Sequence, residues 1–213
     1  MLKLYGAPMS NYYNMVKIAL LEKRLPFEEI LQPPVQDEPY LAKSPMGKIP
    51  TLETDRGFIT ETHAVLDYLE DAHPAPSFRP ADPFARAKVR ELTQGIELYI
   101  ELVARRGLGV LFGRPVADDV KASIKADLEK GIRALNRLTK FGPWVAGQDI
   151  SYADFVLYYT LALGAISAKA NAGIDLVGEL GAGAWQVRMA ARDSVKKADA
   201  AAAAFRKQMA ANR

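Results

Sequence analysis

The chain has 213 residues, of which 49% are hydrophobic and 25% are charged, a composition typical of folded globular proteins. Its length suffices for one large domain or two small ones. It contains two histidines and no cysteine. This composition excludes disulfides, thiolate metal sites and a cysteine nucleophile, and we expect no metal centre.

The formal net charge of +3 is unevenly divided along the chain. Residues 1–80 hold 8 Lys/Arg and 11 Asp/Glu, whereas residues 81–213 hold 20 and 14. The basic residues of the second part are mixed with acidic ones, as on solvated helix faces, and no aromatic residues interleave with a basic run. We therefore expect no nucleic-acid partner.

The beginning of the chain, MLKLYGAPMS, lacks the basic flank and the long apolar run of a signal peptide. The longest apolar stretch, residues 155–166, is too short to span a bilayer. These observations predict a cytoplasmic protein with no membrane partner.

The first third of the chain alternates between strand-like and helix-like segments. In chain order we expect a strand at 3–5, a helix through Val16 and Leu20 that ends before Pro26, a strand at 27–31, a short helix near Tyr40, a hairpin of strands 51–53 and 58–60, and a helix through Val65 and Leu69. The order is βαβ followed by ββα, with a parallel first pair and an antiparallel hairpin.

The segment PAPSFRPADP, residues 74–83, holds four prolines, which is typical of a linker. Beyond it the strand patterns cease, and long helical segments are predicted at 85–112, 118–140 and 193–211. Ser151 and Asp154 have the spacing of a capping box at the start of an apolar helix. We interpret Asp154 as a structural capping residue.

This organisation predicts a domain at 1–76 that mixes strands and helices, a linker at 77–84 and an all-α domain at 85–213. Within the first domain, the stretch SPMGKIPTL places Lys48-Ile49 between a glycine and a proline just before a strand. Glu61-Thr62 then offers a carboxylate, a hydroxyl and exposed amides at a helix start. Together the two segments predict a site for a peptide-like ligand.

A βαβ–ββα domain with a proline before its third strand resembles the thioredoxin-like fold. Its relatives commonly place a cysteine at the start of the first helix, where the helix terminus lowers the thiol pKa. The corresponding residues here, 8–13, read PMSNYY. A thiol at this site would therefore have to arrive with the ligand.

Five motifs in order make the chain resemble the cytosolic glutathione S-transferases over nearly its whole length. They are LYGAPMS before a helix, SPMGKIPTL, FITETHAVLDYL, the proline-rich linker, and GQDISYAD at the start of a buried helix. The APMS segment is most similar to serine-type members, with bacterial theta-like or phi-like relatives. The resemblance implies a homodimer that uses glutathione as co-substrate.

The resemblance also implies which residues hold the glutathione backbone. Pro50 should be cis, so that Ile49 presents its N–H and C=O to the cysteinyl unit like one rung of an antiparallel ladder. Lys48 and Gln36 lie where the glycyl carboxylate is held in the family.

Glu61 and Thr62 match the pair that grips the γ-glutamyl end of glutathione. The carboxylate of Glu61 suits the ammonium group of the ligand. The hydroxyl of Thr62 and the amides of the helix start suit its carboxylate.

Ser10 then lies beside the sulfur, where its hydroxyl would favour the thiolate that attacks the electrophile. Ser10 also fits the N-cap of the first helix, and one hydroxyl can serve both purposes. Asn11 and Tyr5 are rival donors, because some relatives use the next residue along the chain or a tyrosine on the first strand.

Candidate residues of the electrophile pocket are Tyr12, Tyr13, Leu108 and Phe112, although such residues at helical spacing more often serve packing. The predicted reaction is attack of the glutathione thiolate on a small hydrophobic electrophile. A glutathione-dependent isomerase, dehalogenase or peroxidase is the alternative enzyme. The non-catalytic alternative is a regulatory protein of the same fold, such as a stringent-starvation-type partner of RNA polymerase.

Overall fold

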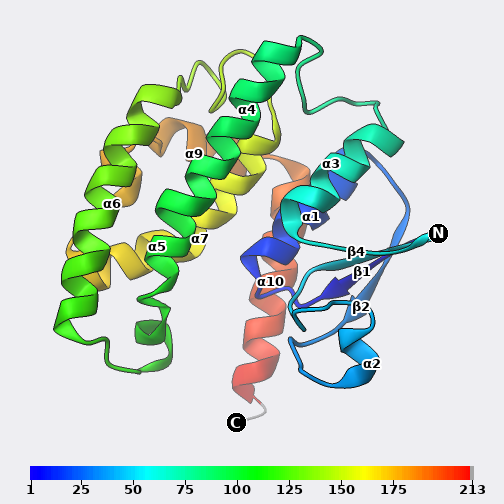
Figure 1. Ribbon diagram of the computed structural model, residues 1–213, viewed down its shortest axis with the longest axis horizontal. Helices are drawn as coiled ribbons and strands as arrows, with labels where there is room; N and C mark the ends of the chain where they lie inside the picture. Colours follow the sequence, from blue (N-terminus) through cyan, green and yellow to red (C-terminus); the bar gives the residue numbers. More distant parts are fainter. Residues whose placement is uncertain (212–213) are drawn as a thin grey trace. The chain divides into compact units, whose positions relative to one another are not determined.

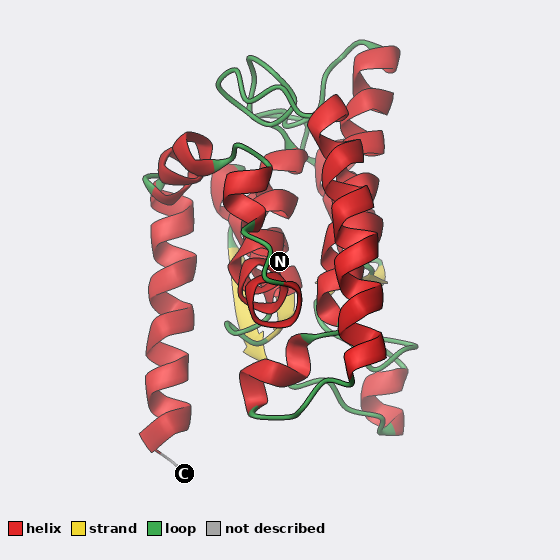
Figure 2. Cartoon of the chain, turned by 90° about the vertical axis from the view of Figure 1, so that its left-hand side faces the viewer, coloured by secondary structure: helices red, strands yellow, loops and turns green. Residues whose placement is uncertain are grey.

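The computed structural model describes residues 1–211, and by packing the chain divides into two compact units. The first unit joins Met1–Ser77 to the segment that begins at Ala191, and the second spans Phe78–Ala190. Within residues 1–211, all four strands belong to the first unit. They are the yellow elements of Figure 2. None of the helices within residues 1–211 is long and apolar enough to cross a membrane.

The first unit is built on a four-stranded mixed sheet. Its strands are β1 (Leu2–Gly6), β2 (Phe27–Leu31), β3 (Thr51–Thr54) and β4 (Gly57–Thr60), in the spatial order β2-β1-β3-β4. β1 and β2 are parallel, and the other neighbours are antiparallel. The predicted βαβ–ββα order is therefore confirmed.

The side chains of the sheet separate into a buried face and a more polar face. Leu4 and Leu52 are directly paired and fully buried. The alternation of side chains along a strand places Lys3 and Glu53 on the other face, where they form an ion pair at 3.0 Å. Helices α1 (Asn11–Glu22) and α3 (Thr62–Ala72) pack against each other on one side of the sheet, and the short α2 (Glu38–Leu41) lies on the other (Figure 1).

The last described helix, α10 (Asp193–Ala211), packs against α1 of the first unit. Glu22 at the end of α1 accepts two hydrogen bonds from the Arg192 guanidinium group, from Nε at 2.8 Å and from Nη2 at 2.6 Å. The Ser194 hydroxyl donates to the same carboxylate. The sequence predicts the helix at the observed residues but groups it with the second half of the chain. Its packing places it with the first unit, and the domain boundaries remain a prediction.

A buried ion pair stabilises the end of α3 and the segment that follows it. Nζ of Lys23 lies 2.9 Å from the Glu70 carboxylate, and both side chains are almost completely buried. The same ammonium group donates to the carbonyl oxygens of His73 at 2.7 Å and Pro76 at 2.8 Å. Removing one partner of such a pair would leave an uncompensated buried charge.

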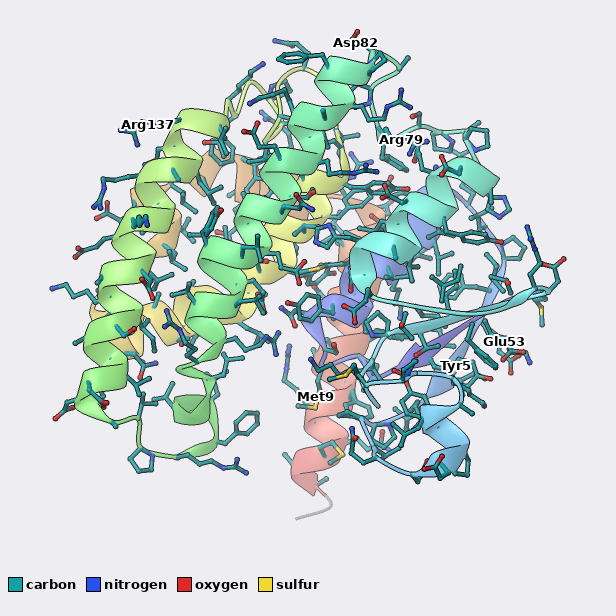
Figure 3. The ribbon with its side chains drawn as sticks, viewed as in Figure 1. Tyr5, Met9, Glu53, Arg79, Asp82 and Arg137 are labelled. Atoms are coloured by element: carbon teal, nitrogen blue, oxygen red, sulfur yellow. The ribbon has the colours of Figure 1, made fainter. Side chains whose placement is uncertain are left out.

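The second unit is entirely helical. Its elements are α4 (Pro83–Ile96), a π-helical segment (Glu97–Glu101), α5 (Leu102–Arg105), a 3₁₀ segment (Leu108–Phe112), α6 (Asp118–Leu138), α7 (Tyr152–Ala172), α8 (Leu176–Glu179) and α9 (Gly183–Ala190). Asp82 starts α4, because its Oδ2 accepts a hydrogen bond from the Ala85 N–H at 2.7 Å (Figure 3).

The long helical segment predicted at 85–112 is present, but it is not one continuous α-helix. The α-helical pattern gives way to the π-helical segment at Glu97, and a methyl group on Gly131 of α6 would lie 2.4 Å from the Tyr99 carbonyl oxygen. Such close backbone packing depends on a partner far along the chain, so periodicity within 85–112 cannot reveal it.

The capping box at the start of α7 is present as predicted. Asp154 accepts from the Ser151 N–H at 2.8 Å, and also from the Val145 N–H at 3.0 Å and Nε1 of Trp185 at 2.8 Å. Burial raises the pKa of this carboxyl group, against the lowering effect of these donors. The contacts support the structural interpretation of Asp154.

Candidate active site at one end of the sheet

Strand register brings the candidate residues of the first unit to the same end of the sheet. Thr51, at the start of β3, pairs with Tyr5 near the end of β1 and with Thr60 at the end of β4. The residues just before Thr51 therefore lie between the chain leaving β1 and the chain leaving β4. These three segments are 48–50, 7–10 and 61–62.

The Ile49–Pro50 peptide bond is cis, as the family resemblance implies. Pro50 is buried and Ile49 is half-buried. Within residues 1–211, the structure records no hydrogen bond to the N–H or C=O of Ile49. These two backbone groups remain available to pair with an extended ligand.

Sequence reasoning missed two side chains that hold this segment. The Ser44 hydroxyl donates to the Lys48 carbonyl oxygen at 2.8 Å and accepts from the Lys48 N–H at 3.1 Å. The Tyr40 hydroxyl donates to the same carbonyl oxygen at 2.9 Å. Tyr40 lies in a stretch without a periodic pattern, and Ser44 is the first residue of the SPMGKIPTL motif. Neither position reveals a contact with Lys48, because that contact depends on how the chain folds back.

Glu61 has a backbone conformation that is unusual for a residue other than glycine. It precedes α3 with φ 65° and ψ 117°, and its exposed side chain makes no capping hydrogen bond. Such a conformation costs about 1–3 kcal/mol and tends to occur at functional sites. The strain places an exposed carboxylate at this end of the sheet.

Thr62 is buried and is the first residue of α3. The first amides of a helix have no partner within that helix, and the helix dipole makes them attractive to an anion. Glu61 and Thr62 therefore combine a negative side chain with an anion-binding helix start. A zwitterionic amino-acid end matches both features.

Ser10 caps α1 from the segment that follows β1. Its Oγ accepts a hydrogen bond from the Tyr13 N–H at 3.3 Å, and its backbone N–H donates to the Ala7 carbonyl oxygen at 2.9 Å. The side chain is half-buried. Because a hydroxyl both accepts and donates, the cap leaves the Ser10 proton available to a ligand.

Tyr5 directs its hydroxyl toward Glu53 rather than toward this segment. The hydroxyl donates to Oε2 of Glu53 at 2.5 Å, and this hydrogen bond, with burial, raises the pKa of Tyr5 to about 12. Figure 3 shows Tyr5 beside Glu53, with Met9 of the segment before α1 in a different part of the unit. The Tyr5 hydroxyl is therefore engaged within the protein.

The other aromatic candidates on α1 differ in exposure. Tyr12 is half-buried, whereas Tyr13 is buried and donates to Oε2 of Glu29 at 2.5 Å. Burial and this hydrogen bond raise the pKa of Tyr13. The rival donor Asn11 is the first residue of α1 and is also buried.

The remaining predicted residues are Lys48 and Gln36 in the first unit and Leu108 and Phe112 in the second. Lys48 is exposed, and the exposed Gln36 donates through Nε2 to the Met46 carbonyl oxygen at 3.0 Å. Leu108 and Phe112 both lie in the 3₁₀ segment of the second unit, where Leu108 is half-buried and Phe112 is exposed. Among the described residues, no group of three or more Asp, Glu, His or Cys side chains could hold a metal ion.

Comparisons with known proteins identify the family of the chain. Residues 4–77 match the family model described as glutathione S-transferase, N-terminal domain. A glutathione S-transferase of Pseudomonas putida is 46% identical over 180 residues, which cover 84% of this chain and 82% of that protein.

Two further relatives extend the comparison. A maleylacetoacetate isomerase of Dictyostelium discoideum is 30% identical over 164 residues, covering 72% of this chain and 75% of that protein. The crystal structure of a glutathione S-transferase from Pseudomonas fluorescens superposes with a TM-score of 0.75 at 26% identity, covering 91% of this chain and 96% of that one. By sequence and by fold, the chain belongs to the glutathione S-transferase family.

Proposed function

We propose that the protein binds glutathione at this end of the sheet and activates its thiol for attack on a small hydrophobic electrophile. The observation that carries the proposal is the convergence of three segments at one sheet end. They supply free backbone groups at Ile49, an exposed carboxylate at a helix start, and a serine hydroxyl with a proton to donate.

In the proposed complex, the cysteinyl unit of glutathione pairs with the N–H and C=O of Ile49. The γ-glutamyl ammonium group lies at Glu61, and its carboxylate lies at Thr62 and the first amides of α3. Lys48 is exposed and attracts the glycyl carboxylate. Gln36 is engaged with the Met46 carbonyl group, so we assign it to the scaffold of this segment.

In the chemical step, Ser10 donates a hydrogen bond to the glutathione sulfur. A free thiol has a pKa of about 8.5, so little thiolate exists at neutral pH. Lowering that pKa by about two units requires about 2.7 kcal/mol, and one hydrogen bond to a charged group contributes about 1.5–3 kcal/mol. The thiol proton leaves to solvent, and the sulfur forms a bond to the electrophilic carbon as the leaving group departs.

An isomerase is the second candidate function. It is favoured by the 30% identity to a protein named maleylacetoacetate isomerase. Isomerisation would use the same thiolate: the sulfur adds to a double bond, rotation occurs about the resulting single bond, and the sulfur is then eliminated. The glutathione-binding residues would be the same in both reactions.

We also propose a cytoplasmic homodimer with one such site in each subunit, as the family resemblance implies. Light scattering in solution tests the dimer directly. A monomer at micromolar concentration would contradict it.

The proposed function is tested by titrating the protein with glutathione in a calorimeter and by measuring turnover of a general aryl halide. Saturable binding below millimolar concentration with turnover supports a transferase. Binding with cis–trans isomerisation of a maleyl-type substrate, and no turnover of the halide, supports the isomerase. No binding at millimolar glutathione contradicts both and favours a non-catalytic protein.

A further inference from the structure

We infer that Tyr40 and Ser44 are positioning residues for glutathione, because they hold the Lys48 peptide groups so that Ile49 is presented to the ligand. The inference rests on the proposed function and adds two side chains to it. Neither touches the thiol. They act through the backbone that precedes Pro50.

Ser44 makes two hydrogen bonds to one residue. Its hydroxyl donates to the Lys48 carbonyl oxygen at 2.8 Å and accepts from the Lys48 N–H at 3.1 Å. Its exposed fraction is 1%, so water does not compete for these groups. A single buried side chain therefore closes the turn from 44 to 48.

Tyr40, which lies in α2, hydrogen-bonds to the same carbonyl group. Its hydroxyl donates to the Lys48 carbonyl oxygen at 2.9 Å and lies 3.1 Å from Oγ1 of Thr51. Because the single phenolic proton goes to the carbonyl oxygen, the Thr51 hydroxyl is the donor in the second bond. Thr51 starts β3, so Tyr40 links the turn to the sheet on both sides of Pro50.

Backbone geometry at Gly47 also supports the turn. Gly47 has φ 61°, and a methyl group added there would lie 2.2 Å from the Val35 carbonyl oxygen. The Val35 N–H donates to the Gly47 carbonyl oxygen at 3.1 Å. The turn is therefore held by the loop at 35 as well as by the side chains of Tyr40 and Ser44.

These hydrogen bonds determine which peptide groups are left for a ligand. Side chains of the protein occupy both the N–H and the C=O of Lys48, whereas no described residue occupies those of Ile49. A ligand that pairs with backbone is thereby directed to Ile49. A turn held in its bound geometry avoids the entropic cost of ordering it on binding.

The test compares Tyr40→Phe and Ser44→Ala with the wild-type protein. Tyr99→Phe and Ser123→Ala serve as matched controls, because both side chains are exposed and lie in the second unit. The measurements are the Kd of glutathione by calorimetry, KM for glutathione, kcat at saturating glutathione, and the thermal midpoint. Each variant loses two hydrogen bonds, one of them to the Lys48 carbonyl oxygen, and we expect a rise of about 2- to 10-fold in Kd and KM for each.

Because Tyr40 and Ser44 share the Lys48 carbonyl oxygen, their effects on Kd should not be additive in the double variant. We expect kcat at saturation, and the pH at which bound glutathione ionises, to stay at their wild-type values. A merely structural role would lower the thermal midpoint without changing the Kd of the folded protein, and that result overturns the inference.

Two outcomes separate this inference from the function on which it rests. If wild-type protein binds glutathione but both variants bind it with unchanged Kd, the positioning role is wrong and the function stands. If wild-type protein does not bind glutathione, both are wrong. Should Ser44→Ala fail to fold, Tyr40→Phe decides the question alone, because it removes only a hydroxyl group.

Discussion

The Oγ of Ser10 accepts a hydrogen bond from the Tyr13 N–H at 3.3 Å. The hydroxyl therefore serves helix α1 through its acceptor side only, which leaves its proton for a ligand. Capping and the proposed catalytic role thus make no competing demand on this side chain. Their effects can be separated by substitution.

Ser10→Ala should lower kcat/KM about 10- to 100-fold near pH 6.5, because the bound thiol returns toward its ordinary pKa of about 8.5. The Kd of glutathione should change much less, since the peptide groups of the ligand are held elsewhere. Loss of the cap should also cost about 1 kcal/mol of unfolding free energy. Steady-state kinetics and urea denaturation measure the two effects.

Ser10→Thr is the matched control, because it retains a capping hydroxyl. It should keep most of the stability and part of the activity. Unchanged turnover in Ser10→Ala would show that Ser10 does not stabilise the thiolate. A large loss in Asn11→Ala instead would assign the role to the neighbouring amide.

Tyr5→Phe should leave kcat/KM within about 2-fold of the wild-type value. The Tyr5 hydroxyl is engaged with Glu53 at 2.5 Å, and its pKa is raised to about 12. The phenol stays protonated at neutral pH, and its one proton is already donated to Glu53, so it is not available to a thiolate. A loss comparable to that of Ser10→Ala would show that Tyr5 reorients in the complex.

Glu61→Gly should stabilise the folded protein while weakening its affinity for glutathione. Glycine adopts φ 65° without the steric cost that glutamate pays. We expect a gain of about 1 kcal/mol in unfolding free energy, since relief of strain exceeds the entropic cost of glycine. Urea denaturation and calorimetry measure the two quantities.

Glu61→Gln separates charge from backbone conformation. It keeps the strained backbone and removes the charge, so it should weaken glutathione binding by about 1.5–3 kcal/mol without stabilising the fold. Equal affinity in wild-type protein and Glu61→Gln would contradict the assignment of the γ-glutamyl ammonium group to this carboxylate.

Acidification should loosen the attachment of α10 to α1. Burial alone would raise the pKa of Glu22, but hydrogen bonds from Arg192 and Ser194 hold it below its ordinary value of 4.5. A lowered pKa contributes stability above the unfolded-state value, and that contribution is lost as the pH falls through the folded-state value. The unfolding free energy should therefore fall below about pH 4.5.

The Glu22→Gln variant isolates this effect. It should be less stable than wild-type protein at pH 6 and should lose less stability between pH 6 and pH 3, as followed by urea denaturation. An identical pH dependence in the two proteins would show that the contact between Glu22 and Arg192 contributes nothing measurable in solution.

Local patterns predicted much of the fold. The strand at 27–31 and the helix at 193–211 are found at the predicted residues. Ser151 and Asp154 form the predicted capping box, because capping depends on residues three apart. Features that depend on distant partners escaped prediction, as the π-helical segment at 97–101 and the packing of α10 on α1 show.

The candidate site likewise contains residues that motifs indicate and residues that only the fold brings into contact. Ile49-Pro50, Glu61 and Ser10 stand in motifs to which the family resemblance assigns a role. Ser44 stands in a motif too, but the resemblance assigns it no role. Tyr40 and Ser44 contact Lys48 only because α2 and the following turn fold back over it. A proline-rich segment carries no periodicity from which that return could be inferred.

The central claim is that the protein lowers the pKa of glutathione bound at this site through Ser10. The most direct measurement is a pH titration of thiolate absorbance in the complex of glutathione with wild-type protein and with Ser10→Ala. We predict a bound thiol pKa of about 6.5 in the wild-type complex and a return toward about 8.5 in the variant. A wild-type value equal to that of free glutathione, or a lowered value that Ser10→Ala leaves unchanged, would contradict the claim.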